Sequence, residues 1–211
     1  MSKYDKFWSA SSAAGNLVEE VNKVFGKYGT FTIESAEFSL MMQRLEGIKP
    51  ELFAFTWMNE STFKLYSEPN RNEKRNPEDS FDKYDVGPLQ MNVAQLKANI
   101  DNKFISIKGL ELAKIIGTKG PLFNGDPIQN SQCASRFLLR IGRGEIVANK
   151  QGKSVVLFPK AITNWNTLSM DEQDIRRAVA YTGPDARPFR LDSWLKFGLM
   201  YKKFFEEFQN T

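Results

Sequence analysis

The chain has 211 residues with no histidine and one cysteine, Cys133, so acid–base chemistry must come from other side chains. This composition excludes catalytic centres that use histidine as the base, imidazole metal sites and an internal disulfide. A carboxylate can act as a general acid when apolar surroundings favour its protonated form. Glu60 is best placed for this role, because it follows the apolar run 53–58 and precedes Phe63. The alternative for Glu60 is a surface carboxylate that ends a helix.

The elements that position Glu60 follow from the spacing of apolar residues. Pro50 opens a helix that is apolar nearly all round, and Ser35 is the expected N-cap of the helix before it. The buried face expected for that earlier helix carries Phe38, Met41, Met42 and Leu45. The same periodicity predicts helices over residues 17–25, 35–47, 50–59, 94–100, 108–116, 127–141, 170–181 and 191–208.

Two segments of the chain have no helical pattern. Residues 66–84 are polar and contain Pro69 and Pro77, which predicts a long loop. Residues 145–148 and 155–158 flank Gly152 and predict a small β-hairpin. The sequence therefore predicts a single mostly α-helical α+β domain with a minor β portion.

Four segments resemble, in the same order, the sequence motifs of one family. Residues 55–63, with Glu-Ser-Thr-Phe at their end, and residues 85–92, with Gly-Pro-Leu-Gln-Met, resemble two motifs of the lysozyme-like superfamily. Residues 126–130, with Asp-Pro-Ile-Gln-Asn, and residues 178–184, with Ala-Val-Ala-Tyr-Thr-Gly-Pro, resemble two further motifs. The chain is thus similar to the soluble lytic transglycosylases and the goose-type lysozymes.

The resemblance carries expectations about fold and domains. It implies a lysozyme-like fold, mostly α-helical, in which the small β portion forms one wall of a glycan cleft. Residues 49–211 would form the lysozyme-like catalytic domain. Residues 1–48 are expected to be an N-terminal helical extension packed on that domain.

The resemblance also implies a peptidoglycan-cleaving enzyme, a lytic transglycosylase. Glu60 would protonate the glycosidic oxygen between N-acetylmuramic acid and N-acetylglucosamine, and would then accept a proton from the 6-hydroxyl of the substrate. The product is a 1,6-anhydro sugar, and no second carboxylate is obligatory. Gln90, Asn130 and Tyr181 match family positions that line the cleft and hold the sugar or the acid, and their alternative role is hydrogen bonding within the strand and helices. Ser61 matches a substrate-site position that more often supports the helix end than contacts glycan.

Three alternatives stay open. Asp85 precedes Gly87 as the second carboxylate of chicken-type lysozymes precedes its glycine, which would make the protein a hydrolytic muramidase. Asp85 could equally be a turn residue that opens a strand. Asn92 stands where goose-type lysozymes tend to carry a water-orienting aspartate, which argues against an inverting hydrolase. A third possibility is a catalytically silent glycan-binding or assembly module.

The sequence departs from the family pattern at several positions. Residues 61–86 form a longer connection than the family usually has, and Pro88 replaces an aliphatic residue. Thr182 stands where asparagine is common. These differences leave the details of sugar binding open.

The charge distribution gives weak evidence about partners. The formal net charge is +4 with a pI near 9.0, and residues 136–160 contain six basic side chains and one acidic side chain. A solvated surface explains this stretch more simply than an acidic polymer, so nucleic acid is not an expected partner. The family resemblance implies peptidoglycan strands as the partner. No cofactor or metal is expected, and the sequence leaves the oligomeric state open.

Localisation follows from patterns that are missing. No apolar stretch approaches the roughly 20 residues of a membrane span, and the first residues lack the pattern of a secretory signal peptide. We therefore expect synthesis in the cytoplasm and action on the cell wall in the periplasm or outside the producing cell. Phage lysis, a virion component or an injected effector would each provide the route. An effector would also have a proteinaceous inhibitor or immunity protein.

Overall fold

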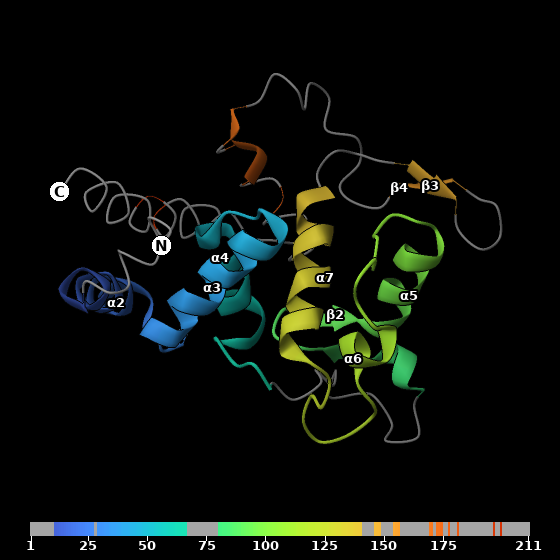
Figure 1. The fold of residues 1–211 in the computed structure, drawn as a ribbon, viewed down its shortest axis with the longest axis horizontal. Coiled ribbons are helices and arrows are strands. Elements are labelled where there is room, and N and C mark those ends of the chain that lie inside the picture. The colour runs from blue at the N-terminus through green and yellow to red at the C-terminus, as the bar shows by residue number, and fades with distance from the viewer. Residues whose placement is uncertain are drawn as a thin grey trace.

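The computed structural model describes residues 11–27, 29–66 and 80–140, the strand residues 146–148 and 154–156, and residues 169, 170, 172–174, 177, 181, 196 and 199. This part of the chain is mostly helical and has two small antiparallel two-stranded sheets (Figure 1). The mostly α-helical α+β prediction is thereby confirmed at this level. The elements are α2 Ser11–Phe25, α3 Ile33–Glu46, α4 Pro50–Ser61, the 3-10 helix η1 Phe81–Lys83, β1 Asp85–Val86, β2 Met91–Asn92, α5 Val93–Asp101, α6 Leu112–Ile116, α7 Pro127–Arg140, β3 Ile146–Ala148 and β4 Ser154–Val156.

Helix α4 is the buried element from which the candidate site is built. Pro50 stands in its first turn, where the missing N–H costs no hydrogen bond and the fixed φ suits a helix. Thr62 follows the helix in the left-handed conformation (φ 54°), and its N–H donates to the Met58 carbonyl at 3.1 Å. Most of the side chains between these ends are buried: Leu52, Phe53, Ala54, Phe55, Thr56, Trp57, Met58 and Ser61.

Helix α3 packs against α4 and α7, and two sequence expectations for it are wrong. Its N-cap is Thr32, whose hydroxyl accepts a hydrogen bond from the Ser35 N–H at 3.2 Å. Leu45, expected in the core, is 49% exposed, and small residues are buried instead. The Ser39 hydroxyl donates to the Ser35 carbonyl at 2.8 Å, so it can be buried while α3 lies close to its neighbours. The buried residues of α3 are Ser35, Ala36, Ser39, Leu40 and Met42.

One hydrophobic core joins the N-terminal helices to the remainder of the described chain. It includes Leu17 and Val21 from α2, Phe53 and Trp57 from α4, and Leu138 from α7. The described part of residues 1–48 therefore shares a core with residues 49–138. The functional division of the chain at residue 48 stays a prediction.

Among the remaining secondary-structure predictions, most of those that the described residues cover are confirmed and one is wrong in part. Helix α7 and the β3–β4 hairpin, in which Val147 lies opposite Val155, are confirmed. The helix predicted over 108–116 is wrong in its first half, because only Leu112–Ile116 are helical. Residues 170, 172–174, 177, 181, 196 and 199 are helical, as expected. The rest of those two predicted helices, most of the 66–84 loop and Thr182 lie outside the described residues.

Candidate functional site

Four of the six predicted site residues, Glu60, Asp85, Gln90 and Tyr181, line one cavity of about 220 Å³. The cavity is bounded by the end of α4, the β1–β2 hairpin, one face of α5 and Phe137 of α7. Segments distant in sequence therefore meet at one place. Its lining residues are Glu60, Asp85, Gln90, Met91, Asn92, Gln95, Leu96, Asn99, Phe137 and Tyr181.

Glu60 is held at the end of the rigid α4 helix and its side chain is half-buried. Directly after the helix, Thr62 and Phe63 both have a positive φ, 54° and 66°, which turns the chain sharply. The Phe63 ring then packs against the rings of Phe31 and Trp57, with centroids 5.2 and 5.5 Å apart. These contacts fix the segment that follows Glu60, so its carboxyl group belongs to a preorganised part of the fold.

Ser61 lies behind Glu60 rather than in the cavity. It is 8% exposed, and its hydroxyl contacts the Pro88 carbonyl at 2.6 Å and the Lys64 carbonyl at 3.1 Å. The first contact joins the end of α4 to the turn between β1 and β2. Ser61 therefore sets the position of Glu60 relative to the hairpin, whereas direct contact with a sugar stays a prediction that its burial does not favour.

The β1–β2 hairpin forms one wall of the cavity. Asp85 pairs with Asn92 and Val86 pairs with Met91, and the turn between them is closed by the Gln90 N–H, which donates to the Gly87 carbonyl at 3.1 Å. The Gln90 Nε2 donates to the same carbonyl at 2.9 Å. This second bond holds the Gln90 side chain against the turn at the edge of the cavity.

Asn130 supports this wall from behind. Its side chain is fully buried, and its Nδ2 donates to the Ile115 carbonyl at 2.9 Å and approaches the Val86 carbonyl at 3.5 Å. Gly87 has a φ of 79°, and a Cβ at this position would lie 2.1 Å from the Asn130 Oδ1. Asn130 therefore positions the hairpin, and within the described structure it does not line the cavity.

Tyr181 holds the hairpin from the other side. Its hydroxyl donates to the Leu89 carbonyl at 2.7 Å, and its ring packs against Phe137 at a centroid distance of 5.9 Å. Burial raises the pKa of Tyr181 well above its usual value, and the nearby charges of Glu60 and Asp85 act in the same direction. The phenol therefore stays neutral and keeps its proton for the bond to Leu89.

Sequence reasoning missed the contribution of α5 to the site. Asn92 is the N-cap of α5, because its Oδ1 accepts from the Gln95 N–H at 3.1 Å, while its Nδ2 donates to the Asp85 Oδ1 at 3.0 Å. One residue thus starts the helix and orients a carboxylate of the cavity. Gln95, Leu96 and Asn99 follow on the same helix face, at a spacing that could have pointed to them.

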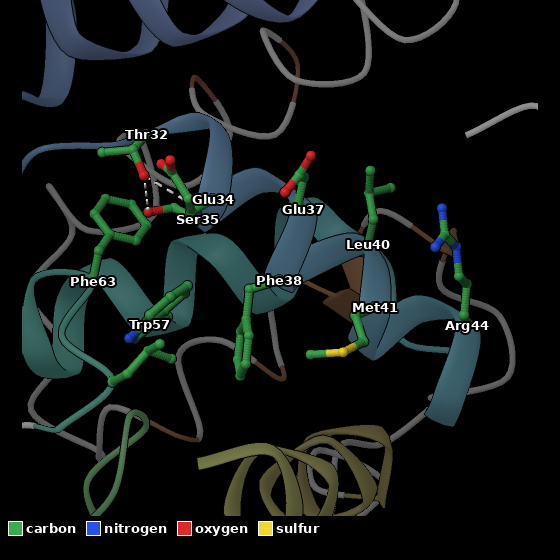
Figure 2. Close-up of a pocket in the computed structure, with 11 residues that line it drawn as sticks. Thr32, Glu34, Ser35, Glu37, Phe38, Leu40, Met41, Arg44, Trp57 and Phe63 are labelled. Atoms are coloured by element: carbon green, nitrogen blue, oxygen red, sulfur yellow. Dashed lines mark hydrogen bonds between the residues drawn. The ribbon is translucent and has the colours of Figure 1, made fainter. Parts of the chain in front are cut away.

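A second cavity of about 720 Å³ lies along α3 and α4 (Figure 2). It is larger but contains none of the predicted site residues. Its carboxylates, Glu34 and Glu37, are not buried, and Figure 2 shows Phe38 and Met41 pointing away from Glu37. Its walls therefore offer apolar contact rather than acid–base chemistry. The lining residues are Thr32, Glu34, Ser35, Glu37, Phe38, Leu40, Met41, Arg44, Trp57, Phe63 and Leu65.

The described residues contain no group of three or more His, Cys, Asp or Glu side chains that could hold a metal ion. No helix among them has both the length and the apolar character to cross a bilayer.

Comparison with known proteins identifies no relative of this chain. No protein family matches it, and neither the curated proteins nor the solved structures contain a significant match.

Proposed function

We propose that the protein is a lytic transglycosylase that cleaves the β-1,4 bond between N-acetylmuramic acid and N-acetylglucosamine in peptidoglycan. The observation that carries the proposal is that Glu60, Asp85, Gln90 and Tyr181, from three separate segments of the sequence, line one cavity. They come from three of the four motifs, since Asp85 and Gln90 share one. Each motif alone gives little evidence, and the meeting of three of them at one cavity supports the resemblance. The lysozyme-like fold is part of the same proposal.

In the proposed reaction Glu60 performs both proton transfers. Its protonated carboxyl group donates to the glycosidic oxygen while the bond from that oxygen to the muramic C1 breaks. The 2-acetamido group of the sugar supports the positive charge that develops at C1. The 6-hydroxyl then attacks C1, and the Glu60 carboxylate accepts its proton, which restores the acid. Ser61, Asn130 and Tyr181 contribute by holding the hairpin wall at a fixed place relative to Glu60.

A hydrolytic muramidase is the second candidate, and one contact favours it. Asp85 lines the same cavity as Glu60, and its Oδ1 accepts the hydrogen bond from Asn92. A carboxylate held in this way could stabilise or attack the cationic centre, as in a retaining glycosidase. We favour the transglycosylase because the segments around Asn130 and Tyr181 resemble that branch of the family.

The test is mass spectrometry of soluble fragments released from purified peptidoglycan by the wild type and by Glu60→Gln. We expect anhydro-muramic ends, one water lighter than reducing ends, from the wild type and none from the variant. Glu51→Gln is the matched control, because Glu51 lies on the first turn of the same helix and does not line the cavity. Release by Glu60→Gln at the wild-type rate would contradict the role of Glu60.

The other outcomes separate the candidates. Reducing ends would identify a muramidase and give Asp85 a catalytic role, testable with Asp85→Asn. Binding to sacculi with no released fragments from several wall types would leave a glycan-binding or assembly module. The proposed substrate also requires delivery to the cell wall, through phage lysis, a virion or effector injection, and an effector would be neutralised by an inhibitor protein bound at the cleft.

A further inference from the structure

The side chain of Asn99 has a position that its structural surroundings do not explain. It is 2% exposed and lines the cavity that contains Glu60. Its backbone carbonyl accepts from the N–H groups of Phe104 and Ile105 at 2.8 and 3.2 Å, so the end of α5 is fixed. Its side-chain amide, in contrast, makes no hydrogen bond to any described residue. The amide atoms of Asn99 are not among the fully buried polar atoms without a partner, so they are accessible from the cavity, where a ligand or water would satisfy them.

The surroundings of Asn99 combine a second amide with apolar walls. Gln95 lies one turn earlier on the same face of α5, and its side chain also makes no hydrogen bond to the described part of the chain. Leu96, Met91 and Phe137 are 1%, 5% and 5% exposed and line the same cavity. The arrangement therefore offers hydrogen-bond donors and acceptors beside an apolar surface.

We propose that Asn99, assisted by Gln95, binds the 2-acetamido group of an N-acetylated sugar in the cavity. An acetamido group has one N–H, one carbonyl and one methyl group. The Asn99 Oδ1 would accept from the N–H, the Nδ2 would donate to the carbonyl, and the methyl group would pack on the apolar side chains. Asn92 is not available for this role, because it already bonds to Asp85 and to the Gln95 N–H. The inference rests on the proposed function, since it concerns the same cavity.

The test compares two neutral β-1,4-linked trisaccharides, tri-N-acetylchitotriose and cellotriose, which differ in the acetamido groups. Their binding is measured by calorimetry with the full chain carrying Glu60→Gln, with and without Asn99→Leu. We expect Asn99→Leu to weaken binding of the acetylated trimer about 10-fold and to leave cellotriose unchanged. Leucine has the same number and branching of side-chain heavy atoms as asparagine and has no amide, and the cavity beside it leaves room for its larger methyl groups, so the melting temperature should stay equal or rise.

Asn102→Leu is the matched control, because Asn102 is the C-cap residue of the same helix and does not line the cavity. It should not change the affinity for either trimer. Equal affinity of Asn99→Leu and its parent for the acetylated trimer would overturn the inference. A lower melting temperature together with equal weakening of both sugars would also overturn it, because Asn99 would then act on the fold alone.

The outcome is separable from the proposed function. Release of anhydro fragments from peptidoglycan by the wild type, together with no preference for the acetylated trimer, would overturn the acetamido subsite and leave the transglycosylase standing. Absence of both fragments and trimer binding would overturn both. Preference for the acetylated trimer that depends on Asn99, without any fragments, would retain the subsite in a glycan-binding protein.

Discussion

At the scale of single residues, the hairpin wall depends on how closely Gly87 and Asn130 approach. Any Cβ at Gly87 would overlap the buried Asn130 amide, and the positive φ adds a second cost. We expect Gly87→Ala to lower the free energy of unfolding by about 2–4 kcal/mol. Urea denaturation at neutral pH measures this change.

Gly109→Ala is the matched control for this prediction. Gly109 has nearly the same φ, 80°, but a Cβ there meets no atom within 4 Å. Its substitution should cost only the conformational term, about 1–2 kcal/mol. Equal losses for the two variants would show that the contact between Gly87 and Asn130 does not constrain the wall.

Cys133 gives a prediction about alkaline pH. Burial raises the pKa of the Cys133 thiol from its ordinary value of 9.0 to about 12. Below pH 9 the thiol is neutral in both the folded and the unfolded state, so its ionisation does not oppose folding. As the pH rises from 9 toward 12, the thiol ionises only in the unfolded state, and the free energy of unfolding falls. Between pH 8 and pH 10 the loss amounts to about 1.4 kcal/mol.

Cys133→Ala isolates this contribution. The variant should have a lower stability at pH 8 because it removes a buried sulfur atom, but its stability should decline less between pH 8 and pH 10 than that of the wild type. Urea denaturation of both proteins at the two pH values checks the difference. Parallel declines would contradict the assignment, since the other titrating groups are common to both proteins.

At the scale of elements, the site depends on the connection between α4 and the β1–β2 hairpin. Ser61→Ala removes the hydroxyl that contacts the Pro88 carbonyl and should lower the free energy of unfolding by about 1 kcal/mol. Because Glu60 directly precedes Ser61, we also expect fragment release from peptidoglycan to slow about 10-fold. Denaturation and initial release rates measure the two effects.

Ser39→Ala is the control for a hydroxyl that acts only on stability. Ser39 is buried in α3, its hydroxyl donates within the helix, and it does not line the cavity. Because its hydroxyl bonds only to a carbonyl of its own helix, we expect a small change in stability and unchanged release. Equal release rates for Ser61→Ala and the wild type would show that the hairpin does not need this connection to hold its place near Glu60.

At the scale of the whole molecule, an ion pair joins α3 to α7. The Arg136 guanidinium donates to both oxygens of Glu46 at 2.7 and 2.9 Å, and the Glu46 side chain is 8% exposed. Arg136 also donates to the Ser106 carbonyl at 2.6 Å, and Arg140 lies over the Phe104 ring. Two of the six basic residues in the 136–160 stretch therefore make internal contacts, which weakens the case for an acidic polymer.

Loss of one partner of this pair should be costly. Arg136→Met leaves the Glu46 carboxylate buried without its main partner, and we expect the free energy of unfolding to fall by about 3 kcal/mol. Lys97→Met breaks the exposed pair with Asp82 and should cost less than about 1 kcal/mol. Urea denaturation of both variants tests the difference, and similar losses would contradict the structural role of Arg136.

The sequence by itself determined those helices whose signals lie within one short segment. The proline at the start of α4, its continuous apolar run and the periodicity of α7 were sufficient to predict buried helices, because helix formation and burial follow from neighbouring residues. The absence of histidine excludes histidine as a general base or metal ligand. The face of α3 was predicted only in part: Met42 is buried and Phe38 and Met41 pack against the core, but Leu45 is exposed. Apolar spacing did not reveal that Ser35 and Ser39 are buried.

Only the tertiary structure decided which side chains share the cavity. Gln95 and Asn99 carry no motif, and they became candidate binding residues only when α5 packed beside the hairpin. Asn130 was predicted to line a cleft but lies behind its wall, because its amide donates to the Ile115 carbonyl of α6 and approaches the Val86 carbonyl of the hairpin. Ser61 likewise contacts the hairpin backbone at Pro88. These outcomes depend on contacts between segments far apart in the chain, and no pattern within one segment encodes such contacts.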